Sequence, residues 1–144
     1  MSTLTTRAST RSAAENAARG AMGALIELHR ALLAHAFFQH EQAHEVRLAP
    51  LERLHLATTD AAFAWLRPMS ELIVELDELL DAPRSDPGEL VAFRTEIERL
   101  TAASDDPTSI GARLRALLDT EVTVAASYAA LERELSRIVD RRLS

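Results

Sequence analysis

The sequence of 144 residues contains no cysteine and no lysine, and it has only four glycines, four phenylalanines, one tyrosine and one tryptophan. Without cysteine, disulfides, thiolate zinc ligation and thiol catalysis are excluded. Scarce glycine and aromatic residues beside abundant alanine and leucine favour helix over sheet. No apolar run approaches the roughly 20 residues that a membrane-spanning helix needs, so the sequence predicts no membrane insertion.

The charge balance is acidic, with a formal net charge of −6. Nucleic-acid binding through phosphate contacts needs a basic face, so no nucleic-acid partner is expected. Residues 1–12 are rich in serine and threonine and lack the apolar segment of a secretory signal, which predicts a disordered N-terminal tail and a cytoplasmic protein. The length matches one ordinary domain, and we place a single helical-bundle domain at residues 13–144.

Prolines divide the rest of the chain into predicted helices. The first helix runs without proline from Ala13 to about Leu48, and Pro50 begins the second. Pro68 interrupts this second helix, which predicts a kink or break near Leu66–Arg67. Apolar or small residues recur along it at helical spacing, namely Leu54, Thr58, Ala61, Trp65, Met69, Leu72, Leu76 and Leu79.

Two Asp-Pro pairs predict the starts of the remaining helices. Asp86 before Pro87 is typical of a helix cap followed by a first-turn proline, and Asp106 before Pro107 repeats the pattern. The third helix is short, whereas the last runs to near the C-terminus on an apolar stripe that Glu121 interrupts. The sequence thus predicts an all-α fold, an antiparallel bundle of four helices with a long first and a long last helix.

All five histidines lie between His29 and His55, which makes this part of the chain the candidate for ligand chemistry. His29 interrupts the apolar stripe of the first helix, as Glu121 does that of the last. A buried carboxylate is costly without a partner. In an antiparallel pairing residue i of the first helix faces about 154 − i of the last, and a parallel pairing puts His29 against about Thr123. Both place Glu121 within about one turn, 5.4 Å, of His29.

The register of the first two helices adds a third feature at the same height. Residue i faces about 98 − i across this hairpin, so His29 lies beside Met69 and the break at Pro68. These features predict either a small polar pocket or a His–Glu pair that only fixes helix register. His35 points about 120° away from His29 on an ideal helix, and we expect it on the surface.

A second histidine group lies at the predicted turn between the first two helices. His40 and His44 are four residues apart, so their imidazoles share one helix face. His55 follows the turn and lies nearly opposite His44. With Asp60, about a turn and a half further along, these side chains suit Zn²⁺, Ni²⁺ or iron.

Two motif types resemble those of known metal-binding bundles. Ferritin-like carboxylate bundles carry Glu-x-x-His motifs, which are similar here to Glu41-x-x-His44 and Glu52-x-x-His55. Hemerythrin-like bundles, in which a di-iron site binds oxygen, use spacings similar to His40-x-x-x-His44 and His55-x-x-x-x-Asp60. The resemblance covers residues 29–60 and, loosely, the last helix, and it implies a helical bundle with a metal role.

Two further features have a structural and a functional interpretation. Glu71, Glu75 and Glu78 form an acidic stripe, which is either a solvated helix face or a dock for a basic partner. Trp65 beside the Pro68 break either packs in the core or forms the floor of a ligand pocket.

Two functions follow from these patterns. In the first, a small soluble bundle binds a divalent metal, the candidate ligands being His29, His40, His44, His55, Asp60 and Glu121. In the second, the bundle is an interaction or oligomerisation module that pairs with a partner helix or a second copy, and a buried His–Glu pair is structural. A homodimer can also complete a metal site. No nucleophile–base grouping is visible, so a non-enzymatic role is favoured and catalysis is left open.

Overall fold

The computed structural model describes the backbone of residues 2–82 and 86–139 and the side chains of residues 13–82 and 86–139. This part of the chain is all-helical, without strands, which confirms the predicted fold class. The predicted number of four helices is wrong, because two of the expected helices are broken. The elements are α1 (Ser2–His44), α2 (Pro50–Thr59), the 3-10 helix η1 (Ala61–Leu66), α3 (Arg67–Asp81), α4 (Pro87–Thr101), α5 (Ile110–Leu118) and α6 (Val122–Leu135).

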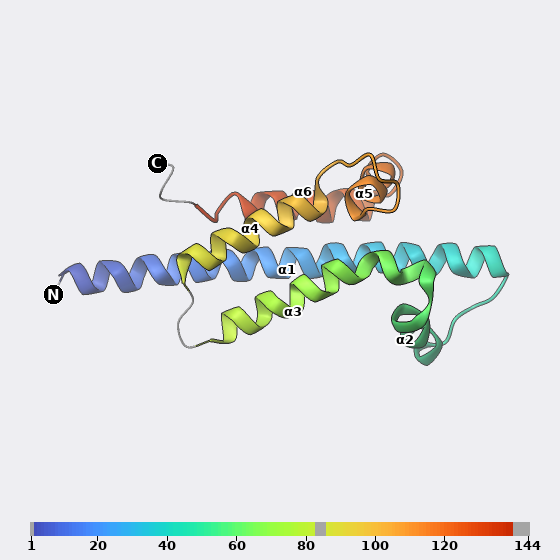
Figure 1. Ribbon diagram of the computed structural model, residues 1–144, viewed down its shortest axis with the longest axis horizontal. Helices are drawn as coiled ribbons and strands as arrows, with labels where there is room; N and C mark the ends of the chain where they lie inside the picture. Colours follow the sequence, from blue (N-terminus) through green and yellow to red (C-terminus); the bar gives the residue numbers. More distant parts are fainter. Residues whose placement is uncertain (1, 83–85, 140–144) are drawn as a thin grey trace.

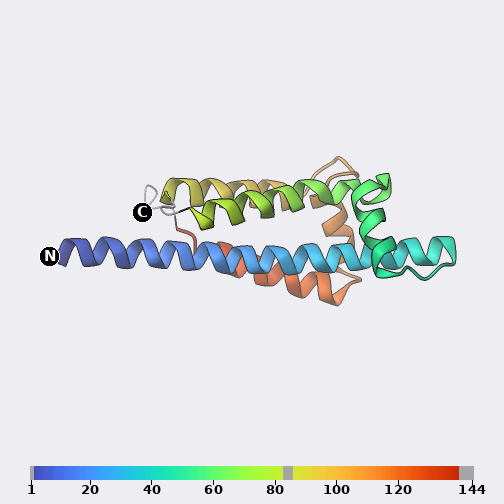
Figure 2. The same ribbon diagram turned by 90° about the horizontal axis from the view of Figure 1, so that it is seen from below.

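Helix α1 is the scaffold of the molecule. Helices α3, α4 and α6 pack around it, and α1 and α4 run in one direction while α3 and α6 run in the other (Figures 1 and 2). The helix begins at Ser2, within the segment for which the sequence predicts a disordered tail. None of the helices in the described ranges is both long and apolar enough to cross a bilayer. The buried stripe of α1 is alanine-rich and then leucine-rich, with Ala17, Ala21, Ala24, Leu25, Leu28 and Leu32.

The second predicted helix is broken twice. The predicted break near Leu66–Arg67 is present, because η1 ends at Leu66 and α3 begins at Arg67 with Pro68 in its first turn. A further break at Asp60 separates α2 from η1, and the Asp60 carboxylate caps η1 by accepting a hydrogen bond from Ala62 N at 2.8 Å. Helix α2 consequently leaves the bundle and buries none of its residues, so Leu54 at the start of the predicted stripe is exposed.

The last predicted helix is also broken, so the prediction of a long last helix is wrong. Helix α5 ends at Leu118, and Glu121 is the N-cap residue of α6 instead of a residue within a continuous apolar stripe. Asp119 and Thr120 lie at this break, and both residue types are weak helix formers that compete for backbone hydrogen bonds. The break turns the chain back along α1.

The two Asp-Pro pairs behave differently. Asp86 caps α4 as predicted, its carboxylate accepting a hydrogen bond from Gly88 N at 3.0 Å. Asp106 does not cap a helix, because its carboxylate accepts from Thr108 N and Thr108 Oγ1 within the loop. Ser109 caps α5 in its place through a bond from Ala112 N.

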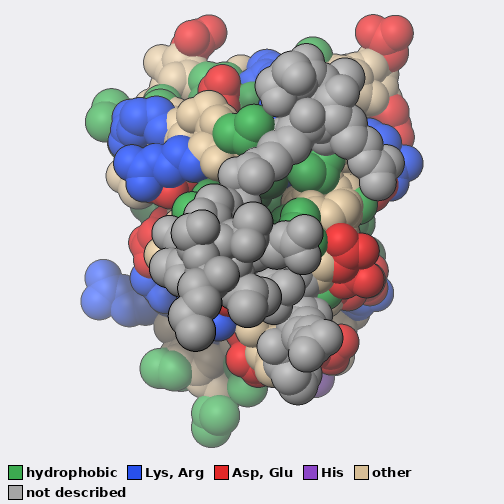
Figure 3. Space-filling model, turned by 90° about the vertical axis from the view of Figure 1, so that its left-hand side faces the viewer, with side chains coloured by type: hydrophobic (Ala, Val, Ile, Leu, Met, Phe, Trp, Pro, Cys, Tyr) green, Lys and Arg blue, Asp and Glu red, His purple; other side chains and the backbone are tan. Residues whose placement is uncertain are grey.

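The register of the first and last helices follows the antiparallel one of the two pairings considered. Helices α1 and α6 are antiparallel, with His35 against Glu121 and Gly20 against Glu134, within two residues of the relation 154 − i. Across α1 and α3, His29 contacts Ser70, one residue from the predicted partner Met69. The end of the molecule at which α1 begins carries acidic and basic side chains around its rim (Figure 3).

Candidate functional site

His29 lies against α3 and not against Glu121. Its Nε2 is 2.8 Å from Ser70 Oγ, in the first turns of α3 just after the Pro68 break. Burial lowers the pKa of His29 from its ordinary value of 6.5, because the half-buried ring loses the solvent that stabilises its charged form. The predicted His29–Glu121 pair is therefore wrong.

His35, and not His29, lies beside Glu121. Its Nδ1 is 3.6 Å from Glu121 Oε1, and its side chain is only 15% exposed while that of Glu121 is 42% exposed. His35 Nε2 is buried and has no hydrogen-bond partner. The prediction of a surface position for His35 is wrong because α1 is covered on more than one side, so that a residue 120° from the first stripe is also largely covered.

The three remaining histidines surround one hollow at the turn between α1 and α2. The rings of His40 and His44 lie 4.3 Å apart between centroids, and His55 reaches the same hollow from α2. The hollow has a volume of about 550 Å³. Its other lining residues are the apolar Val46, Leu48, Leu51 and Leu56 and the acidic Glu52.

The carboxylates near this hollow are engaged by the turn. Glu41 accepts a hydrogen bond from Leu48 N at 2.9 Å and lies 3.4 Å from the Arg53 guanidinium. Glu52 accepts from Ala49 N at 3.3 Å, and the Asp60 carboxylate caps η1. Among the described residues, no three histidine, aspartate or glutamate side chains are grouped so that they hold a metal ion.

A small apolar cluster holds α2 in place beneath the hollow. Leu48 and Phe63 are buried with Ala36 and Phe37 of α1, and the rings of Phe37 and Phe63 lie 5.0 Å apart. The ring of His40 is 5.9 Å from that of Phe63. Helix α1 ends at His44, and the next residue, Glu45, has a left-handed backbone with φ of 54°. Leu56 and Ala57 of α2 pack against this cluster and fix the position of the helix, although none of its residues is fully buried.

Large apolar side chains are exposed around the hollow. Leu51 and Leu54 of α2 are 81% and 63% exposed, and Val46 in the turn is 47% exposed. The end of α1 and helix α2 extend beyond α5 and α6 (Figures 1 and 2), so no helix in the described ranges covers these side chains. We call Val46, Leu51 and Leu54 together with His40, His44 and His55 the hairpin-end surface.

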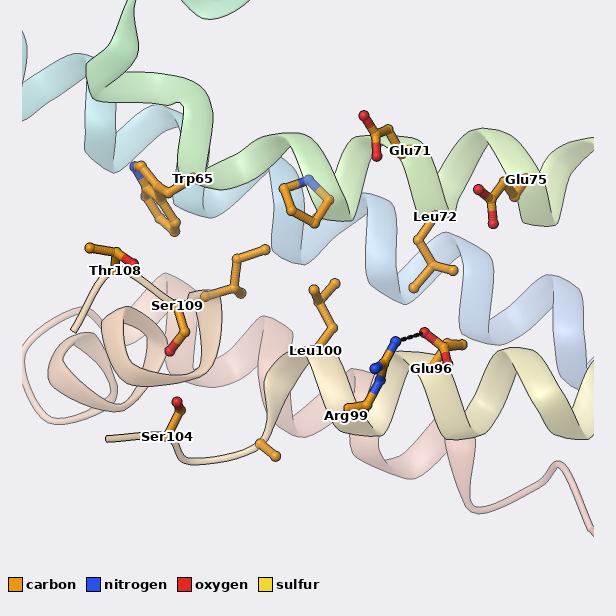
Figure 4. Close-up of a pocket in the computed structure, with 13 residues that line it drawn as sticks. Trp65, Glu71, Leu72, Glu75, Glu96, Arg99, Leu100, Ser104, Thr108 and Ser109 are labelled. Atoms are coloured by element: carbon orange, nitrogen blue, oxygen red, sulfur yellow. Dashed lines mark hydrogen bonds and ion pairs between the residues drawn. The ribbon is translucent and has the colours of Figure 1, made fainter. Parts of the chain in front are cut away.

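A second hollow, a cleft of about 500 Å³, lies between α3, α4 and the loop before α5 (Figure 4). Leu72 and Leu100 point into it from opposite sides, and Trp65 closes one end beside the loop. Glu71 and Glu75 line it on the α3 side, and the ion pair of Glu96 with Arg99 lines it on the α4 side. Such a cleft suits a small molecule with an apolar body and a positive charge.

The sequence singles out some residues of this cleft but does not predict that they line one cavity. Trp65 and the acidic stripe of Glu71 and Glu75 were separate features, because only the packing of α4 and its following loop against α3 makes them neighbours. Arg113 of α5 lies 4.8 Å from the Trp65 ring centroid, a contact that sequence spacing does not indicate.

Comparisons with known proteins do not assign the chain to a family. No family model matches it, and neither curated proteins nor solved structures gave a match. The function is therefore argued from the side chains and their surroundings.

Proposed function

We propose that this protein is a helical self-association module that forms a homodimer through the hairpin-end surface. The observation that carries the proposal is the exposure of Leu51 and Leu54 on a helix that buries none of its residues. An amphipathic helix gains stability mainly by covering its apolar face. Contiguous apolar side chains that a monomer leaves exposed mark an interaction surface.

The shape of the hairpin-end surface favours a second copy as the partner. A two-fold interface requires one surface that is complementary to itself. Here the same surface carries a hollow lined by Val46, Leu48 and Leu56, and Leu51, which also lines it, is 81% exposed. Leucines of one copy can therefore fill the hollow of the other.

The charges around the surface also suit self-pairing. Glu45, Arg47 and Glu52 are exposed near the hollow, so both signs are present on one face. A two-fold arrangement can place the acidic side chains of one copy against the basic side chain of the other. A strongly basic or acidic foreign partner is not favoured by such a mixed surface.

The proposal is tested by the oligomeric state of the full chain in sedimentation velocity experiments. We expect a dimer that the double substitution Leu51→Glu/Leu54→Glu converts to a monomer, because two buried carboxylates oppose association. Val74→Glu is the matched control, since Val74 is equally an exposed apolar residue but lies on α3 outside the surface. A strict monomer at high concentration, or a dimer that survives the double substitution, contradicts the proposal.

A further inference from the structure

We infer that His40 and His44 form half of a Zn²⁺ site, which the same two histidines of a second copy complete. The inference rests on the proposed dimer and adds a ligand to it. His40 and His44 are one helical turn apart on α1, and both line the hollow of the hairpin-end surface. The spacing lets two imidazoles of one helix bind one ion.

One chain offers too few ligands for a closed site. A structural zinc site takes four protein ligands in tetrahedral arrangement. The nearby carboxylates of Glu41 and Glu52 already accept hydrogen bonds from the turn backbone. No third ligand joins His40 and His44 within the described ranges, although His55 lines the other side of the hollow. A two-fold axis beside His40 and His44 supplies the missing two imidazoles from the second copy.

The chemistry of the ligands selects the ion. Neutral imidazole nitrogens suit Zn²⁺ and similar transition-metal ions, whereas Ca²⁺ and Mg²⁺ prefer oxygen ligands. The apolar side chains of Val46 and Leu51 around the site exclude water once two copies meet, which strengthens the bonds to the ion. Because the ligands must be neutral, acid conditions that protonate imidazole release the ion.

The test uses the full chain made without a histidine tag, stripped of metal with EDTA and titrated with Zn²⁺ by calorimetry. We expect one Zn²⁺ for two chains and a dimer that is at least roughly tenfold tighter with Zn²⁺ than with EDTA, since a ligand of the dimer alone stabilises it. Co²⁺ in place of Zn²⁺ reports the geometry by its visible absorption, which is strong for a tetrahedral site.

Variants separate this inference from the proposed dimer. His40→Ala/His44→Ala should abolish the Zn²⁺ response, so that association of this variant is equally tight with Zn²⁺ and with EDTA. His55→Ala, a histidine of the same hollow, should keep the tightening by Zn²⁺ relative to its own association in EDTA. A dimer in EDTA that ignores Zn²⁺, or one Zn²⁺ bound per chain, overturns the metal site and leaves the dimer standing. A monomer under both conditions overturns the proposed function and the inference with it.

Discussion

At the scale of single residues, the histidines of α1 differ in what surrounds their ring nitrogens. His29 has Ser70 as a partner, whereas His35 Nε2 is buried with none. The contact of His35 with Glu121 spans 3.6 Å, and the Glu121 side chain is 42% exposed, so the ion pair contributes little. A buried polar atom without a partner costs about 1–3 kcal/mol. The unpartnered Nε2 of His35 therefore lowers the free energy of unfolding.

Replacing His35 with leucine is expected to stabilise the protein. The substitution removes the unpartnered Nε2 and keeps an apolar side chain of similar size in the packed position. The free energy of unfolding should rise by about 1 kcal/mol, measured by urea denaturation. Glu121→Gln, which leaves the buried nitrogen in place, serves as the control and should change stability little. A loss of stability in His35→Leu would show that the ring has a partner that matters.

The lowered pKa of His29 predicts a loss of stability in mild acid. Unfolding restores the ordinary pKa of about 6.5, so between the folded and unfolded pKa values the unfolded chain binds more protons. The contribution is therefore fully present above about pH 6.5 and is lost as the pH falls toward the folded pKa. His29→Gln cannot titrate, and its stability should fall less than that of the natural chain between about pH 7.5 and pH 5.5. Equal losses in urea denaturation would contradict the assignment.

At the scale of elements, proline marks several of the helix boundaries that the sequence predicts. Pro50 and Pro87 lie in first turns of helices, as predicted, and Pro68 follows the predicted break. The predicted helix start at Pro107 is wrong, because α5 begins only at Ile110. The breaks at Asp60 and before Glu121 carry neither proline nor glycine, and they depend on side-chain caps and on packing against α1. The prediction of the His–Glu pair fails for the same reason, because the break before α6 helps to decide which histidine lies beside Glu121.

Substitution of Gly111 tests how tightly the short helix α5 packs against the loop before it. A methyl group on Gly111 would overlap the backbone carbonyl of Ala102, which cannot move aside as a flexible side chain would. Gly111→Ala should therefore destabilise the protein by about 1–3 kcal/mol or more in urea denaturation. The matched control is Gly23→Ala on α1, where a methyl group meets nothing within 4 Å. That variant should be more stable by about 0.5–1 kcal/mol, because alanine is the better helix former. Similar effects of both substitutions would contradict this packing.

At the scale of the whole molecule, α1 distributes its histidines over separate surroundings. Simple alignment of the helices predicts their heights, because antiparallel packing with short connections leaves little freedom in register. It does not predict their rotation, since that depends on three helices packing around α1 at once. His29 faces α3, His35 faces Glu121, and the others reach the hairpin-end surface. That surface carries Val46, Leu51 and Leu54, three of the large apolar side chains that the fold leaves exposed.

The central claim, association through the hairpin-end surface, is tested most directly by distances between two copies. Because the chain has no cysteine, single spin labels can be attached at Ala43→Cys beside the surface and at Asn16→Cys near the other end of α1. Double electron–electron resonance should then give a shorter distance between two labels at position 43 than between two labels at position 16. A shorter distance at position 16, or no coupling at position 43 at high concentration, would contradict the account.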